Sequence, residues 1–93
     1  MPKVTLEGYI LVPDSDLRVV VGELANHIKL TRQEEGCMFF DVSQDDKNIN
    51  RFNVYEEFHS QSAFELHQQR VINSKWGKIT VNVERHYQIS GSG

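Results

Sequence analysis

Residues 34–67, EEGCMFFDVSQDDKNINRFNVYEEFHSQSAFELH, decide the fold of this chain. The run begins where a first helix is expected to end. Gly36 is predicted to take the left-handed conformation that closes a helix at low cost. The remainder alternates between patterns typical of strands, a turn and a helix, so this one segment predicts most of the architecture.

Two strands follow the expected helix end. Apolar and polar side chains alternate from residue 38 onward, which places Met38, Phe40 and Val42 on one side of a strand. The same two-residue period returns over residues 51–58. The polar cluster at 45–48 predicts a turn, so the two strands should form a hairpin.

A helix is predicted directly after the hairpin. Ser60 lies where a helix N-cap belongs, and Ala63, Phe64 and His67 follow at the spacing of one helical face. We therefore expect the side chain of His67 to point toward the sheet.

The flanking sequence completes the pattern. Residues 4–12 are predicted to form a strand, and residues 17–31 repeat apolar side chains every three or four positions, as on one face of a helix. Residues 70–82 combine apolar side chains with a glycine and a β-branched run, which leaves open whether they form an ordered helix or a lid. A last strand is expected at 84–89, followed by a disordered tail at about 90–93.

The predicted order is β-α-β-β-α-β, the ferredoxin-like pattern of the α+β class. It has an antiparallel four-stranded sheet with the helices on one face, which leaves the other face uncovered. If Tyr9, Phe39 and Tyr55 share the uncovered face, a lone copy exposes aromatic surface. We therefore expect a homodimer in which a second sheet covers this face.

Composition limits the classes of protein that the chain can belong to. Its 93 residues suffice for a single domain, 1–93. The formal net charge is -3 and no run of Lys or Arg occurs, so nucleic acid and anionic membranes are not expected partners. One cysteine allows no internal disulfide, and the first residues lack the apolar core of a signal peptide. These features predict a cytoplasmic protein.

His67 is the first candidate catalytic residue. A neutral imidazole between helix and sheet could remove a proton from a hydroxyl or a carbon near neutral pH. The alternative is a core histidine that is hydrogen-bonded to a backbone carbonyl.

Glu56 is the second candidate. It shares a predicted strand face with Phe52, Val54 and Phe58, where a carboxylate must be paired or have a raised pKa. Arg85 or His67 could be its partner. Glu56 would then orient His67 or the substrate, or it would form a purely structural ion pair.

Aromatic side chains could supply a substrate pocket. A planar aromatic ligand would suit a lining of the following residues, with Arg85 added as a polar contact: Phe40, Phe52, Phe58, Phe64 and Trp76. The alternative is that these side chains simply form the core. No metal site is expected, because no two histidines show HxxxH or HExxH spacing and only one cysteine is present.

Several short motifs, taken in order, resemble the antibiotic biosynthesis monooxygenase family. They are Glu34-Glu35-Gly36-Cys37, Phe40-Asp41-Val42, Arg51-Phe52, Val54-Tyr55-Glu56-Glu57-Phe58 and Ala63-Phe64 through His67. The family pattern looks like an acidic-Gly-Cys helix exit, a strand with Phe, a Tyr-Glu-x-Trp strand and a helix bearing His.

The resemblance implies a dimeric α+β barrel, in which two ferredoxin-like subunits place their sheets face to face. Family activities include cofactor-independent oxygenation of polyphenols and quinols, haem degradation, and isomerisation of a small signalling metabolite. Haem-degrading members look to use Asn, Trp and His. Here Phe58 stands at the Trp position and about Glu7 near the Asn position, so only His67 matches and haem degradation is not expected.

We therefore expect a monooxygenase that needs no cofactor and uses dioxygen on a small phenol- or quinol-type aromatic. His67 would be the base and Glu56 the orienting carboxylate. Two alternatives stay open: an isomerase or other small-metabolite enzyme on the same scaffold, and a ligand-binding dimer without catalysis.

Overall fold

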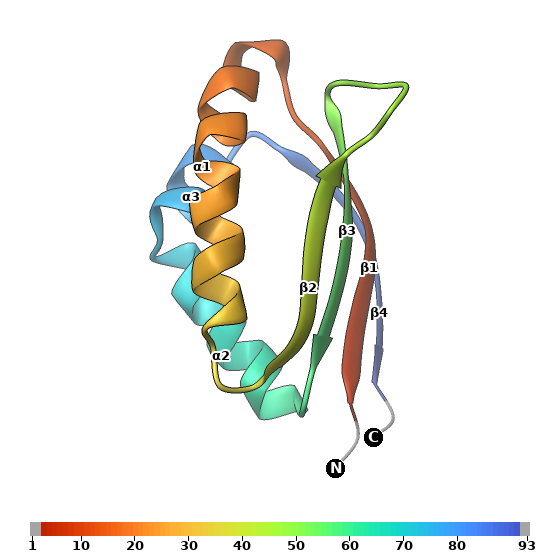
Figure 1. The fold of residues 1–93 in the computed structure, drawn as a ribbon, viewed down its shortest axis with the longest axis vertical. Coiled ribbons are helices and arrows are strands. Elements are labelled where there is room, and N and C mark those ends of the chain that lie inside the picture. The colour runs from red at the N-terminus through yellow and green to blue at the C-terminus, as the bar shows by residue number, and fades with distance from the viewer. Residues whose placement is uncertain (1–2, 92–93) are drawn as a thin grey trace.

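The computed structural model describes residues 3–91 and confirms the β-α-β-β-α-β order, with one short helix added before the last strand. The elements are β1 (Val4–Leu11), α1 (Asp14–Arg32), β2 (Cys37–Gln44), β3 (Arg51–Phe58), α2 (Gln61–Ile72), α3 (Lys75–Ile79) and β4 (Glu84–Gly91). The strands form one sheet in the order β2-β3-β1-β4, and every neighbouring pair is antiparallel. All three helices cover the same face of this sheet (Figure 1).

The register of the strands places Glu56 in the middle of the covered face. Leu6 on β1 lies opposite Glu56 on β3, and both side chains are buried. The neighbours of Glu56 along β3 on this face are also buried, as the two-residue period predicts. A carboxyl group is thus embedded among these core side chains: Val4, Leu6, Ile10, Phe40, Phe52 and Phe58.

The opposite face of the sheet carries aromatic side chains, as predicted. Phe39 and Tyr55 meet edge to face with ring centroids 5.6 Å apart, and Phe39 is 50% exposed. Nearby, Tyr9 stacks on His86, and the guanidinium of Arg51 lies 3.9 Å from the Tyr9 ring centroid. No helix of the described residues covers this face (Figure 1).

Gly36 differs from its predicted conformation. Among the described glycines only Gly8 has a positive φ, so Gly36 does not close α1 in the left-handed region. The helix ends at Arg32, before Gly36 is reached. Gly36 is instead required by packing, because a Cβ there would lie 2.3 Å from the Cβ of Ala63 on α2.

The prediction that Met38 shares a strand face with Phe40 and Val42 is wrong for Met38. A register shift between Cys37 and Phe39 makes Met38 the extra residue of a β-bulge, and its side chain is 47% exposed. The alternation resumes after the bulge, so Phe40 and Val42 are buried as expected.

The ambiguous segment 70–82 forms ordered helical structure. α2 continues to Ile72, and Ser74 then caps α3 by accepting a hydrogen bond from the backbone N–H of Gly77 at 3.2 Å. Gly77 does not break this helix. It lets α3 pack closely against the end of α2, because a Cβ at this position would lie 2.1 Å from the carbonyl oxygen of Val71.

Gly77→Ala should therefore lower the free energy of unfolding by about 1–3 kcal/mol, as expected for overpacking against rigid backbone. Gly22→Ala is the matched control. A Cβ at Gly22 meets nothing within 4 Å and the position is helical, so this variant should gain about 0.5–1 kcal/mol. Urea denaturation at one protein concentration measures both. Equal changes in the two variants would contradict the close approach of α3.

β4 is longer than predicted. It continues through Ser90 and Gly91, which pair with Thr5 and Val4 of β1. The prediction of a tail starting at residue 90 is therefore wrong for these two residues, and Ser92 and Gly93 lie outside the described residues. None of the described helices is both long and apolar enough to cross a membrane.

Candidate active site

His67 lies inside the protein, as its helical spacing predicts. The residue is 4% exposed and its ring packs against Phe58, with centroids 4.8 Å apart, and against Phe40 at 5.9 Å. Ser60 caps the helix that carries it by accepting a hydrogen bond from the backbone N–H of Ala63. The imidazole is thus fixed by a capped helix on one side and by strand aromatics on the other.

Glu34 is the hydrogen-bond partner of the His67 ring. The Nδ1 atom of His67 lies 2.9 Å from Oε1 and 3.1 Å from Oε2 of Glu34. A carboxylate can only accept, so the neutral ring carries its proton on Nδ1 and leaves Nε2 with a free lone pair. The alternative of a core histidine bonded to a backbone carbonyl does not describe this ring, because its partner is a side chain.

Nε2 of His67 faces Glu56. The distance from Nε2 to Oε1 of Glu56 is 3.8 Å, which is too long for a hydrogen bond. Burial lowers the pKa of His67, and the hydrogen bond and negative charge of Glu34 oppose this effect. The ring is therefore neutral at pH 7, with its basic nitrogen aimed inward.

Glu56 holds a proton near neutral pH. Burial, and secondarily the charge of Glu34, raises the pKa of Glu56 to about 8. The sequence predicts either a partner or a raised pKa for Glu56, and the structure has the raised pKa. The acid that results can donate a hydrogen bond to a neighbouring oxygen, which a carboxylate cannot do.

The protonated state of Glu56 makes stability depend on pH. Between pH 6.5 and 8 the folded state keeps a proton that an unfolded glutamate, with its ordinary value of 4.5, has lost. Burial also lowers the pKa of His27 to about 3 and lowers the pKa of His67, so both rings bind fewer protons in the folded state than in the unfolded state. As pH rises above 6.5 the two histidines of the unfolded state lose their protons, so the proton kept by folded Glu56 dominates and stability falls as pH rises.

We expect the free energy of unfolding to fall by about 1 kcal/mol between pH 6.5 and pH 8. Glu56→Gln should abolish this fall, because an amide does not titrate, and stability should then rise slightly with pH as the unfolded histidines lose their protons. Urea denaturation at a series of pH values measures the effect. A variant that keeps the wild-type slope would show that another group causes it.

A small inner cavity of about 30 Å³ adjoins Glu56 beneath the helices. Its lining residues are Ile10, His27, Phe40, Val42, Val54, Glu56, Trp76, Thr80, Arg85 and Tyr87. Three predicted substrate contacts, Phe40, Trp76 and Arg85, thus come together around Glu56. The cavity has the volume of about one water molecule, so an aromatic ring does not fit it in this conformation.

Arg85 does not pair with Glu56, although it was one of the two partners expected. Its guanidinium donates to the carbonyl oxygen of Thr80 at 3.2 Å and to Oγ1 of the same residue at 3.0 Å. Arg85 is thus held at the end of α3 and lines the cavity without neutralising the acid.

The remaining predicted aromatics lie elsewhere in the core. Phe58 and Phe64 meet edge to face at 5.7 Å, and Phe58 forms one wall around His67. Phe52 is fully buried and lines neither the inner cavity nor the open groove beside His67. The five aromatics therefore do not form one continuous pocket.

An open groove lies on the other side of His67. It has a volume of about 720 Å³ and runs along the start of α2. Its lining residues are Glu34, Glu35, Gly36, His59, Ser60, Ser62, Ala63, Leu66, His67 and Arg70. His67 thus lines the open groove, while its Nε2 faces Glu56, which lines the inner cavity.

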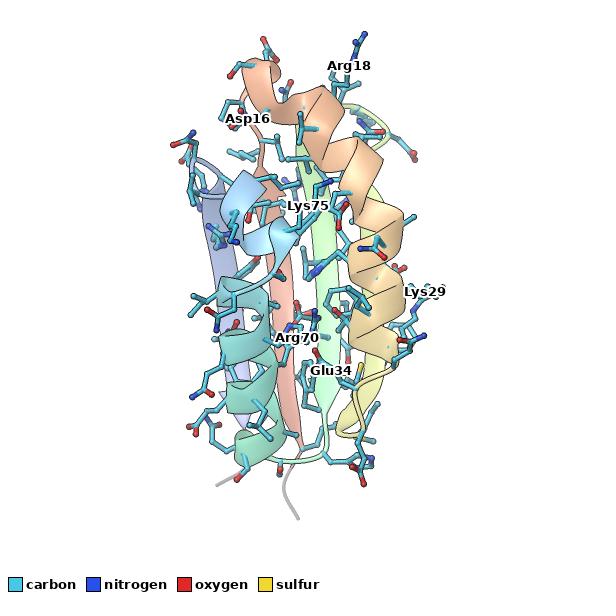
Figure 2. The ribbon with its side chains drawn as sticks, turned by 90° about the vertical axis from the view of Figure 1, so that its left-hand side faces the viewer. Asp16, Arg18, Lys29, Glu34, Arg70 and Lys75 are labelled. Atoms are coloured by element: carbon cyan, nitrogen blue, oxygen red, sulfur yellow. The ribbon has the colours of Figure 1, made fainter. Side chains whose placement is uncertain are left out.

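Several site residues were not predicted from the sequence. Arg70 donates to Glu34 and lies near it between α2 and the end of α1 (Figure 2). His27 is 5% exposed and stacks on Trp76, with centroids 4.4 Å apart. The position of Arg70 three residues after His67 on one helix was an available signal. No spacing rule links Glu34 to a histidine 33 residues later.

The profile of the antibiotic biosynthesis monooxygenase family matches residues 5–76 of the chain. The match spans well over half of the sequence, so the chain belongs to this family. No curated protein matches it.

Solved structures share the fold. A candidate antibiotic biosynthesis monooxygenase from Nitrosomonas europaea is 18% identical with a TM-score of 0.76, covering 99% of this chain and 88% of that one. A Bacteroides thetaiotaomicron protein of unknown function, described as a candidate oxidoreductase, is 12% identical with a TM-score of 0.75, covering 97% and 95%. A Pseudomonas aeruginosa protein is 20% identical with a TM-score of 0.70, covering 98% and 91%. At these identities the likeness concerns the fold alone.

Proposed function

We propose that the chain is a monooxygenase that needs no cofactor and acts on a small phenol or quinol. Its family membership supports the reaction class. One observation carries the proposal: a neutral imidazole, bound at Nδ1 by Glu34, points its free Nε2 at a protonated Glu56 inside the core. A base and an acid thus face each other in surroundings that exclude water.

The chemistry requires little from the protein. Nε2 of His67 takes the hydroxyl proton of the substrate, which leaves an electron-rich anion. That anion passes one electron to dioxygen, and the two radicals join through a new carbon–oxygen bond to give a peroxide. The O–O bond then breaks, with one oxygen kept as a carbonyl and the other released as water. One phenol and one dioxygen thus give one benzoquinone and one water, so the substrate supplies all the electrons.

Each residue of the pair has a defined part in this proposal. His67 holds the first proton and returns it to the peroxide. Glu56, as a neutral acid, donates a hydrogen bond to the oxygen on which negative charge develops. The surrounding Phe58 and Phe40 keep water away from the reactive anion.

The substrate ring would take the space that Trp76 fills. Trp76 lies on the five-residue helix α3, covers the inner cavity and rests on His27. Displacement of this short helix would join the cavity next to Glu56 to bulk solvent. We propose that binding includes this movement.

Oxygen uptake tests the function. Protein treated with a chelator should consume dioxygen with at least one member of a panel of phenols, naphthols and quinols. Labelled dioxygen should place one labelled atom in the product. No uptake with any member, by protein that is folded and of uniform size, would refute the proposal.

An isomerase is the second candidate, because a base and an acid 3.8 Å apart also suit proton transfer between two carbons. Exchange of substrate hydrogen with deuterated water in the absence of dioxygen would favour it. Oxygen uptake that matches product formation would favour the monooxygenase.

We also propose that the functional form is a homodimer joined through the uncovered face of the sheet. Half-exposed Phe39 against Tyr55 supports this, since such apolar surface is usually covered in a partner interface. Sedimentation should give the mass of two chains, and Phe39→Asp should give the mass of one. A monomeric wild type would refute this part alone.

A further inference from the structure

The contacts of Glu34 distinguish it from every other acidic residue around the site. Its two carboxylate oxygens lie 2.9 and 3.1 Å from Nδ1 of His67. The Glu34 side chain is 18% exposed and that of His67 is 3% exposed, so the pair forms the wall between the groove and the core. Neighbouring Glu35 lines the same groove but has no hydrogen bond to the ring among the described residues.

A second set of contacts holds Glu34 in place. Arg70 donates from Nε to Oε2 of Glu34, and its terminal nitrogen donates to Oγ1 of Thr31 at 2.9 Å. The fully buried Thr31 hydroxyl in turn donates to the carbonyl oxygen of His27 at 2.8 Å. The carboxylate is therefore tied to the last turn of α1 and cannot swing freely into the groove.

We infer that Glu34, anchored by Arg70, is the positioning residue of this site and holds the His67 ring with a bare Nε2 toward Glu56. It acts through His67 and needs no contact with the substrate. The catalytic consequence of this inference rests on the proposed function, whereas its effect on the ring does not.

The charges around the His67 ring predict pKa shifts of opposite sign when Glu34 and Arg70 are replaced. Glu34 raises the pKa of His67, whereas the positive charge of Arg70 lowers it. The other titratable groups that face the ring are Glu56, 3.8 Å from Nε2, and His27, with ring centroids 6.4 Å apart. Removing Glu34 should move the pKa of His67 down, and removing Arg70 should move it up.

Nitrogen NMR of the imidazole rings tests this in three variants of the full chain: Glu34→Gln, Arg70→Gln and, as a control, Glu35→Gln. The wild-type His67 should carry its proton on Nδ1. A glutamine amide can either accept from Nδ1–H or donate to a bare Nδ1, so Glu34→Gln should populate both tautomers. It should also lower the pKa of His67. Glu35→Gln removes the same charge one residue away and should leave both the tautomer and the pKa of His67 unchanged.

Loss of structure would raise the pKa of His67, because it removes the burial that lowers this pKa, so it cannot imitate the lowered pKa expected in Glu34→Gln. Arg70→Gln should raise the pKa of His67, and circular dichroism must show that this variant keeps its fold. Arg70→Gln also keeps the inference testable if Glu34→Gln does not fold. An unchanged tautomer and pKa in Glu34→Gln, an equal response in Glu35→Gln, or a lowered pKa in Arg70→Gln would each overturn it.

Kinetics separate positioning from binding. With a substrate found by oxygen uptake, Glu34→Gln should lower kcat by about 10- to 100-fold and leave KM within about twofold. A rise in KM with unchanged kcat would overturn the positioning role. If no substrate is ever consumed, the proposed function fails, and the NMR result still decides what Glu34 does to His67.

Discussion

His67→Ala should lower the turnover of a phenol or quinol by about 100-fold or more, the usual contribution of a general base. The unprotonated Nε2 of His67 lies 3.8 Å from Glu56. His27 also lines the inner cavity, but burial lowers its pKa to about 3, which makes it the weaker base. Oxygen uptake under saturating substrate measures the effect.

The exposed His59→Ala is the matched control, because it removes an imidazole near the same helix without touching the buried pair. Its turnover should match that of the wild type. Circular dichroism and sedimentation must show that His67→Ala keeps the fold. Turnover of this variant equal to that of the wild type would remove His67 from the role of base.

The second large effect is expected in stability. Phe58→Ala should lower the free energy of unfolding by about 3–5 kcal/mol, because it empties the space of a fully buried ring. Phe58 packs on both Phe64 and His67, so the loss reaches the site as well as the core. A small domain is typically stable by only about 5–15 kcal/mol, so this loss is a large share of the total.

Urea denaturation at one protein concentration measures the loss. Ile72→Ala provides the control, because Ile72 is 71% exposed on the same helix as His67 and should change stability by less than about 0.5 kcal/mol. If Phe58→Ala and Ile72→Ala differ by less than about 1 kcal/mol, the packing around His67 is not the packing described above.

Features with a local period could be predicted from the sequence. The burial of Glu56 between Val54 and Phe58 follows from the two-residue period of β3, and the inward position of His67 follows from the spacing of α2. Each depends only on residues a few positions away. The bulge at Met38 interrupts the period of β2, and nothing in the alternation marks it in advance.

Contacts between distant segments could not be predicted in the same way. Glu34 and His67 meet because the chain leaves α1 close to the first turns of α2, and that crossing is a property of the tertiary fold. Because glycine has a low helix propensity, the sequence alone predicts that Gly77 weakens a helix. Its steric role depends on the carbonyl oxygen of Val71, whose position only the packed structure gives.

The close approach at Gly77 has a consequence for how this protein could acquire new ligands. Gly77 does not line the inner cavity, yet it fixes how closely α3, which carries Trp76, packs against the end of α2. A bulkier residue at 77 would be expected to push α3 away from α2 and enlarge the inner cavity beneath Trp76 without altering His67, Glu34 or Glu56. The size of ligand that fits would then be set by a residue that does not line the cavity. The volume of the cavity and the residues that react in it could therefore evolve separately.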